Sequence, residues 1–454
     1  MKKHFTIELR SHRMAVMSAV AALLVVTPLA ASAADADIEQ PSLGDLKHLP
    51  VAPVSKRVDI KKPTFSNPTK ITHPLYPVKS VTQTILLGHV DGQALQVIYT
   101  LMPKTKTITW EGKDIETVEV QYVAHLDRRI EECALDWYAQ ADDGSVWYFG
   151  EKVSNYHDGE VADTDGTWIA GKEGPPAMIM PANPKVGDVY RVENIPGVAF
   201  EEVRVKAIDV TVSGPMGPRT GGMIGEQLHM EGTYSDKTFV PGYGEFITTT
   251  PSEVEAVALA VPTDSLAEAV PAELKAIYQS AMDIFSIADS KKWDDAATKL
   301  QGMKIAWGAM RARGGVSTLL AAQLDRALRT IEGDALQPGV AAKESDGTRN
   351  GALEVALSVL DLQLRYRSPD SVDRDRFAVS ARKTMVDAKA HEQGFVLSDV
   401  VTLELICDRL EHTLGAAAEP TNSLLKELRT AARTEDFSKA GDAARKLLEL
   451  TERW

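Results

Sequence analysis

The 454-residue sequence is poor in the residues that mark several common classes of protein. It has only two cysteines, 6% aromatic residues, and 50 basic residues against 64 acidic ones, which gives a net charge of −14. A chain this acidic is repelled by nucleic acid and by anionic membrane surfaces. No basic cluster interleaved with aromatic residues offsets this balance, so we exclude nucleic-acid binding.

The two cysteines are too few to form a disulfide scaffold. Cys133 and Cys407 fall in different predicted domains, and a bridge between them requires Cα atoms within about 7 Å of each other. Export would make such a bridge chemically feasible, but we expect two buried thiols that act as small hydrophobic side chains. With 44% hydrophobic residues, the chain can build two cores without cross-links.

Catalytic signatures are also missing. The sequence contains no Gly-x-Ser-x-Gly elbow, phosphate-binding loop, His-Glu-x-x-His helix or Cys-x-x-Cys pair. The segment Ser380-Ala-Arg-Lys383 matches a Ser-x-x-Lys motif, but the partner motifs are absent, so we interpret it as a chance match. The sequence therefore assigns no catalytic residue and no cofactor.

Long hydrophobic runs are confined to the N-terminus. A basic start precedes an apolar run from Ala15 to Ala31, which ends in the small-x-small site Ala31-Ser32-Ala33. This pattern predicts a signal peptide at residues 1–33, whose removal changes the net charge to −17. No later run reaches the roughly 20 apolar residues needed for a membrane span. We expect an exported, soluble protein in the periplasm or outside the cell.

The mature chain begins with a proline-rich segment, residues 34–75. Seven prolines lie between Pro41 and Pro77, and apolar periodicity is weak. Such a segment buries too little surface to offset the entropy lost on ordering, so we predict an extended or disordered linker. Phe65, Ile71 and Leu75 are the residues through which it could dock as an arm.

The pattern then changes twice. From residue 76 to 262, apolar and polar residues alternate with a period of two between turns such as Asp91-Gly92 and Glu111-Gly112, which predicts an antiparallel β-rich domain (a curved sheet, half-barrel or sandwich). From 263 to 454, a capping box at Ser265-Leu-Ala-Glu268 and helical periodicity predict an α-helical bundle. The expected helices span residues 272–289, 293–312, 316–333, 350–366, 371–391, 396–414, 422–432 and 435–450. The expected fold class is α+β with two domains.

The scarce aromatic residues gather in one predicted hairpin, from Glu131 to Trp168. They are Trp137, Tyr138, Trp147, Tyr148, Phe149, Tyr156 and Trp168. If the turn is centred on Asp143, residues 135, 137 and 139 lie opposite 151, 149 and 147. One face then carries Trp137, Trp147, Phe149 and Glu151, and the other carries Glu132, Asp136, Tyr138 and Tyr148. A one-residue slip changes this assignment.

Two interpretations of this hairpin remain open. Aromatic rings beside carboxylates suit a bound saccharide or amphiphile, whereas large aromatic residues also fill the core of a wide sheet. Glu151 is the residue of greatest interest, because a carboxylate held against Trp and Phe has its ionised form disfavoured. The alternative is that Glu151 ends its strand in solvent.

A weaker candidate site lies in the helical domain. Glu404, Asp408 and His412 recur at i, i+4 and i+8, so they share one helix face, and helix bundles hold metal ions with such residues. A row of this kind beside an apolar stripe is also typical of a solvated face.

The hairpin residues carry a resemblance. The string DWYAQADDGSVWYFGE, with NYHDG, GTWIAGKEGPPAMIMPANPKVGDVYR and VPGYGEF, resembles a family of exported bacterial proteins of unknown function, over about residues 65–250. The family has an acid after the Gln and an Asn before the Val-Trp, where this sequence has Ala141 and Ser145. The segment LDLQLRYRSPDSVDRDRF is similar to a helical module of other exported bacterial proteins. The resemblance implies export but no activity, and the sheet is remotely similar to half-barrel lipoprotein carriers.

Three functional hypotheses follow. The first is an exported binding protein whose ligand, a small amphiphile or a saccharide, is held by the aromatic and acidic hairpin. The second is an envelope hydrolase in which Glu132, Asp136 and Glu151 perform acid–base chemistry. The third is a structural or interaction protein whose helical bundle docks an envelope protein through an apolar patch.

Overall fold

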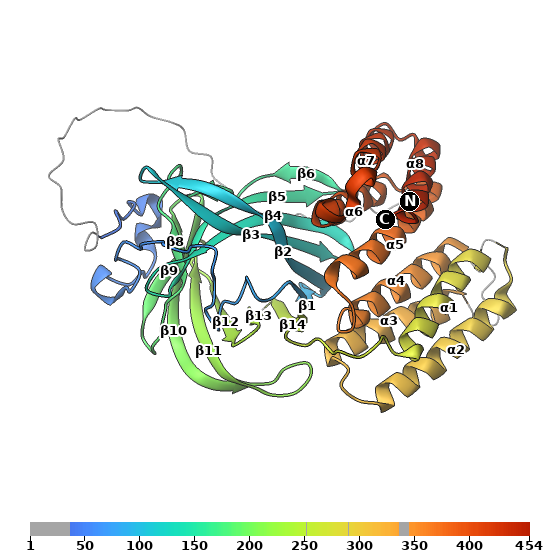
Figure 1. The fold of residues 1–454 in the computed structure, drawn as a ribbon, viewed down its shortest axis with the longest axis horizontal. Coiled ribbons are helices and arrows are strands. Elements are labelled where there is room, and N and C mark those ends of the chain that lie inside the picture. The colour runs from blue at the N-terminus through green and yellow to red at the C-terminus, as the bar shows by residue number, and fades with distance from the viewer. Residues whose placement is uncertain (1–36, 251, 289, 336–344) are drawn as a thin grey trace, which may run out of the picture.

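The computed structural model describes residues 37–250, 252–288, 290–335 and 345–454. The signal peptide expected at residues 1–33 lies outside this part of the chain. A strongly curved antiparallel sheet is followed by a column of helices (Figure 1). The predicted α+β fold with two domains is therefore confirmed.

The sheet consists of two meanders. The first contains β1 (Gln83–Val90), β2 (Gln93–Trp110), β3 (Lys113–Leu126), β4 (Arg129–Gln140), β5 (Val146–His157) and β6 (Glu160–Asp163), with β7 (Trp168–Ile169) and β8 (Ala177–Met180) paired to β5. The second contains β9 (Val189–Ile195), β10 (Ala199–Val212), β11 (Arg219–His229), β12 (Tyr234–Val240), β13 (Gly244–Thr249) and β14 (Glu253–Val261). The meanders join where β1 pairs with β14, so the first and last strands meet in the middle of the sheet.

Short turns hold the strands of the first meander in register. Asp91 and Gly92, and likewise Glu111 and Gly112, all have positive φ. Two consecutive residues with positive φ form the hairpin turn whose twist matches that of paired strands. The turns expected at these two positions are thus confirmed.

Residues 37–82 pack against the sheet. This segment forms two short 3-10 helices, η1 (Gly44–His48) and η2 (Val54–Lys56), and then crosses the hollow of the sheet to reach β1 (Figure 1). Leu46 and Leu49 pack with Phe200 and Leu228. Farther along, Ile71 and Leu75 are buried, and the Phe65 ring meets Phe149 edge-on at 5.4 Å. The segment predicted as an extended or disordered linker thus contains two 3-10 helices and packs on the sheet. The three residues named for an arm, Phe65, Ile71 and Leu75, are among those that make the contact.

The helical domain contains, within the described residues, α1 (Ala272–Ala288), α2 (Trp293–Ala312), α3 (Thr318–Ala335), α4 (Ser345–Gln363), α5 (Pro369–Ala390), α6 (Gln393–Leu414), α7 (Ala418–Arg433) and α8 (Phe437–Thr451). Each expected helix is present with small shifts at its ends. The capping box expected at Ser265-Leu-Ala-Glu268 does not cap a helix, because α1 begins only at Ala272, directly after Pro271. None of the described helices has the length and apolar character required to cross a bilayer.

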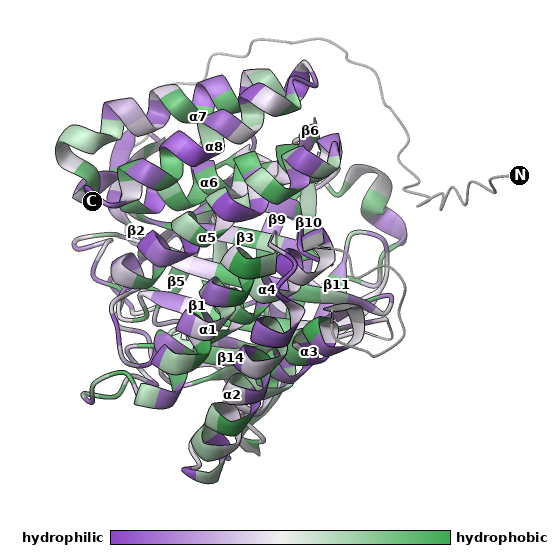
Figure 2. Ribbon diagram, turned by 90° about the vertical axis from the view of Figure 1, so that its right-hand side faces the viewer, coloured by the Kyte–Doolittle hydropathy of each residue, from purple (hydrophilic) through white to green (hydrophobic). Residues whose placement is uncertain are grey.

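The helices cover one face of the sheet, and Figure 2 views the molecule from their side. Val401 and Leu405 of α6 pack against Val123 and Ile130, together with Cys133. Both cysteines are buried free thiols, as expected, and burial raises the pKa of each to about 12.

A buried network of charged side chains also joins the two domains. Asp373 accepts hydrogen bonds from Arg376 at 2.9 Å and from Arg409 at 2.6 Å. These arginines in turn donate to Gln83 of β1 and Gln121 of β3, at 2.8 and 2.9 Å. Because these groups are removed from water and paired in fixed geometry, they set the position of the helices on the sheet.

Candidate ligand-binding cavity

A cavity of about 460 Å³ lies in the hollow of the sheet, on the face opposite the helices. Strand alternation explains the two faces: Gln83 and Ile85 contact the helical domain, whereas Thr84 between them lines the cavity. Both meanders and the end of the N-terminal segment contribute to the wall. The cavity therefore depends on the whole β-domain rather than on the Glu131–Trp168 hairpin alone.

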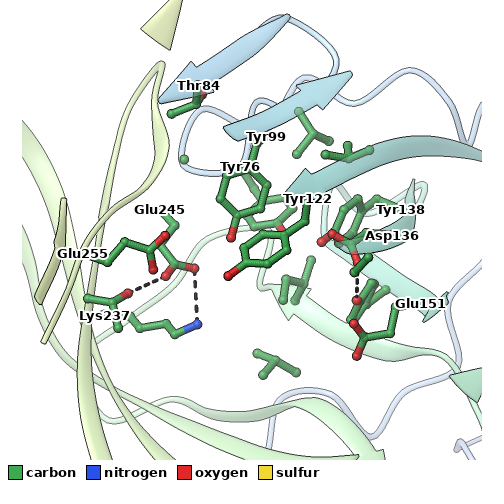
Figure 3. A pocket seen from close by; sticks show the side chains of 18 of the residues that line it. Tyr76, Thr84, Tyr99, Tyr122, Asp136, Tyr138, Glu151, Lys237, Glu245 and Glu255 are labelled. Carbon is green, nitrogen blue, oxygen red and sulfur yellow. Dashed lines mark hydrogen bonds and ion pairs between the residues drawn. The ribbon is translucent and has the colours of Figure 1, made fainter. Parts of the chain in front are cut away.

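Tyr76, Tyr99, Tyr122 and Tyr138 lie together on one side of the cavity (Figure 3). Tyr148 also lines the cavity. Tyr138 and Tyr148 are stacked with ring centroids 4.8 Å apart, and Tyr76 meets Tyr138 edge-on at 5.3 Å. Burial raises the pKa of all five hydroxyls. The hydroxyls therefore stay neutral and can both donate and accept hydrogen bonds.

Carboxyl groups from β4, β5 and β9 lie beside these tyrosines. Tyr148 donates a hydrogen bond of 2.9 Å to Asp136, and burial raises the pKa of Asp136 to about 7. Burial, with repulsion from Glu131, raises the pKa of Glu132 to about 7. Glu151 and Glu193 share a hydrogen bond, and burial followed by mutual repulsion raises the pKa of Glu151 well above its usual range.

The wall formed by the second meander carries a lysine and further carboxyl groups. The Lys237 ammonium lies 3.3 Å from a carboxylate oxygen of Glu245. Burial lowers the pKa of Lys237, but Glu245 and its neighbours outweigh this effect, so the net pKa is raised. Glu255 is only 7% exposed, and its Oε1 has no hydrogen-bond partner within the described residues. Burial and the nearby Glu245 raise the pKa of Glu255 to about 8.

A β-bulge in β5 places Glu151 in the cavity. The pairs Tyr138–Tyr148 and Ala139–Trp147 agree with the register expected for a turn centred on Asp143, but beyond them Glu151 lies opposite Asp136. Gly150 adopts φ +114°, and a Cβ atom there would lie 2.1 Å from the Trp168 carbonyl oxygen. The extra residue turns Glu151 from the face expected to carry the tryptophans to the face of Asp136.

The residues predicted for a ligand platform separate into two groups. Tyr138, Tyr148 and Glu151 line the cavity. The other group lies in the core away from the cavity lining: Trp137, Trp147, Phe149 and Trp168 are buried there, and Tyr156 packs beside Cys133 under α6. The indole N–H groups of three tryptophans are satisfied by Glu119, Ser145 and Glu193. These five aromatic residues therefore belong to the hydrophobic core and do not form a ligand platform.

Most of the cavity residues contributed by the second meander could not be recognised from the sequence. Lys237, Glu245 and Glu255 come from three strands; Glu255 lies between Val254 and Ala256, as a solvent-exposed side chain in a strand would, and Lys237 lies in the polar stretch 235–238. These residues are recognised as cavity residues only in the structure, where both faces of the sheet are buried. The one available signal was the VPGYGEF string, which supplies Tyr243, Gly244 and Glu245 to the cavity wall.

The cavity is connected to the surface. A neighbouring hollow of about 260 Å³ shares Glu132, Glu151, Glu193, Glu201 and His229 with it, and continues to the exposed Asp165 and Glu231. A small molecule could therefore reach the buried carboxyl groups along this side of the sheet.

The residues considered for a metal site do not gather around a common centre. Glu404 is paired with Arg429, and His412 lies 3.2 Å from Asp370. Asp408 is partly buried, which raises its pKa. Within the described residues, no group of three or more His, Cys, Asp or Glu side chains is placed to hold a metal ion.

The sequence matches no protein-family model, and no curated protein matches it.

Proposed function

We propose that this protein is an exported binding protein that holds a small amphiphilic molecule in the cavity of its β-domain. The observation that carries the proposal is the cavity itself, about 460 Å³ of space lined by tyrosine rings and polar groups. Ligand sites commonly occupy about 300–1,000 Å³ and combine an apolar wall with a few well-placed polar groups. The export expected from the N-terminal sequence supplies the proposed location.

The cost of the buried carboxyl groups supports a bound ligand. Removing a carboxylate from water without a partner is expensive, and buried polar groups are normally hydrogen-bonded. Glu255 leaves one oxygen unsatisfied at the cavity wall. A purely structural core would gain stability by replacing this group with an apolar side chain.

The carboxyl groups fit a hydrolase less well. In glycoside hydrolases two carboxyl groups flank the bond to be cleaved at separations of about 5 to 9.5 Å. Glu151 instead interacts with Glu193, which raises the pKa of Glu151, so this carboxyl group is already engaged within the cavity wall. Asp136 is likewise occupied by the Tyr148 hydroxyl.

The docking hypothesis gains little support from the helices. Among the large apolar side chains that are exposed in the described residues, Ile305 is the one that lies on a helix of the bundle. Single exposed apolar residues are common on soluble proteins, whereas docking sites present contiguous patches.

Native mass spectrometry of mature protein purified from an exporting host tests the proposal. We expect a stoichiometric extra mass that is lost in Tyr148→Ala, because this change removes a ring and a hydroxyl from the cavity wall. The matched control is Tyr234→Ala, which alters an exposed tyrosine and should keep the mass. If Tyr148→Ala fails to fold, Tyr148→Phe replaces it, because this variant keeps the ring and removes only the hydroxyl.

Two results would contradict the proposal. One is an extra mass that Tyr148→Ala and the control Tyr234→Ala retain equally. The other is a bare intact protein whose melting temperature is unchanged by a broad panel of small amphiphiles, because a ligand that binds only the folded state raises that temperature.

A further inference from the structure

We propose that the cavity selects a small organic cation, an amine with an alkyl or aromatic body. This inference rests on the proposed binding function and adds the class of ligand. Its basis is the imbalance of charge in the cavity wall: eight carboxyl groups line it, whereas the described lining residues include one lysine, no arginine and one histidine.

Local pairing leaves most of this negative charge uncompensated. Lys237 is paired with Glu245, and His229 lies 2.9 Å from Glu201. Within the described part of the chain, Glu132, Asp136, Glu151, Glu193 and Glu255 form no ion pair with a basic side chain. In a low-dielectric cavity such groups repel one another strongly when they are ionised, so an ammonium group placed among them would favour their ionised forms and relieve the repulsion. An anionic ligand would increase it.

Glu255 shows where an ammonium group would be received. Its side chain is buried, its Oε1 lacks a hydrogen-bond partner in the described structure, and Figure 3 shows it directed into the cavity beside Glu245. An ammonium group brings three N–H donors, and a hydrogen bond between ionised partners is roughly twice as strong as one between neutral groups. A neutral alcohol would donate a hydrogen bond to Oε1 of Glu255 but would leave the negative charge of the carboxylate uncompensated.

The tyrosine wall suits the rest of the same ligand. Tyr99 and Tyr122 meet edge-on at 5.1 Å, and Tyr138 stacks on Tyr148, so ring surface lies close to the carboxyl groups. Aromatic faces attract cations, and more strongly when water is excluded. The ring surfaces would also contact the apolar body of an amine, which a bare metal ion lacks.

Cation binding should release protons near neutral pH. The carboxyl groups of Asp136, Glu132, Glu193 and Glu255 have pKa values of about 7 to 8. The other charged and titratable groups that face them are Tyr148, Tyr138, Glu151, Glu131, Glu201, Glu245, Glu253 and Lys237, and the Trp168 indole donates a hydrogen bond to Glu193. An ammonium ion lowers the pKa of a nearby carboxyl group. Affinity should therefore rise as the pH increases through this range.

Isothermal titration calorimetry with three five-carbon probes separates charge from shape. Pentane-1,5-diamine, pentane-1,5-diol and pentanedioate have similar chains but carry positive, zero and negative charge, and spermidine tests a longer amine. We expect at least one amine to bind at millimolar concentration or below, roughly tenfold or more tighter than the diol. The dianion should not bind, and the heat measured in two buffers should reveal proton release.

Matched variants locate the effect. Glu255→Gln and Glu151→Gln keep the shape of the cavity wall and remove charge, so each should weaken amine binding roughly tenfold. Glu116→Gln removes an exposed carboxylate from β3 and should leave the affinity unchanged. Circular dichroism checks that each variant is folded.

Several outcomes would overturn the inference: no binding of either amine, equal binding of diol and diamine, or equal losses in Glu116→Gln and Glu255→Gln. A co-purified neutral or anionic molecule that is lost in Tyr148→Ala would also overturn it. In that last case the proposed binding function would stand, so the two proposals fail separately.

Discussion

Buried carboxyl groups in the cavity make the ligand-free protein sensitive to pH. The pKa values of Asp136 and Glu132 are about 7, and those of Glu193 and Glu255 about 8, against about 4 for exposed carboxyl groups. A group whose pKa is raised in the folded state stabilises the fold below its unfolded pKa, and this contribution is lost as the pH rises through the folded pKa. The loss therefore begins above the unfolded pKa of about 4 and is complete only above the folded pKa values of about 7 to 8.

We therefore expect the ligand-free protein to be less stable at about pH 9 than at about pH 6, by on the order of 2–4 kcal/mol. Urea denaturation at the two pH values measures the difference. Glu255→Gln should reduce it, because the amide cannot ionise, whereas the exposed Glu116→Gln should not. A stability that is equal at both pH values, or higher at pH 9, would contradict the expectation.

Residue types alone identified Glu151 as a group of interest, since it adjoins aromatic residues in the sequence. They did not identify Lys237 or Glu255, because a charged residue in a polar stretch or between apolar neighbours of a strand normally faces water. In this sheet the charged face lines an enclosed hollow instead. The difference arises from the curvature of the whole sheet, which no local pattern records.

At the level of secondary structure, strand β5 shows how one extra residue determines which side chains face the cavity. Its bulge at Gly150 allows the tryptophans near the turn to face the core while Glu151 faces the cavity with Asp136. The sequence predicted the pairing near the turn and left the possibility of a slip open. A bulge depends on contacts with β7, which a hairpin pattern does not include.

Gly150→Ala should destabilise the protein by about 3 kcal/mol or more. The φ of +114° is strained for any residue with a side chain, and the new Cβ atom would overlap the Trp168 carbonyl oxygen. Thermal or urea unfolding measures the loss. Gly112→Ala is the control, since Gly112 also has positive φ but open space around it, so it should lose only about 1 kcal/mol. Equal losses would show that the contact with Trp168 is unimportant.

Helices were predicted more accurately than strand register because their signals are local. The helix expected at 293–312 matches α2 (Trp293–Ala312) at both ends. The proline-rich segment was harder to predict, because its composition is typical of an unattached linker. A few apolar side chains, among them Leu46 and Leu49, dock it onto Phe200 and Leu228, and those partners lie far away in the sequence.

At the scale of the whole molecule, the two domains are held by buried charge as well as by apolar contacts. Asp373 accepts hydrogen bonds from Arg376 and Arg409, both buried and both bonded to glutamines of the sheet. The pKa of Asp373 is lowered, because the two arginines outweigh the effect of burial. This carboxylate is therefore ionised throughout the neutral range.

Asp373→Ala should lower the free energy of unfolding by about 3–5 kcal/mol, since it leaves two buried guanidinium groups without their counter-ion. Urea denaturation measures the loss, and salt should change it little because the pair is shielded from water. Asp442→Ala breaks the exposed pair with Arg445 and should cost less than about 1 kcal/mol. Similar losses in both variants would contradict a structural role for the buried network.

The pairing of β1 with β14 also determines the order in which the sheet can fold. Each meander pairs neighbouring strands, but Thr82 meets Val261 across 179 positions of the chain. Closing so long a loop is entropically costly and slow. Asp136 and Glu255 belong to different meanders, so a chain that emerges in order during synthesis lacks part of the cavity wall until its last strand arrives.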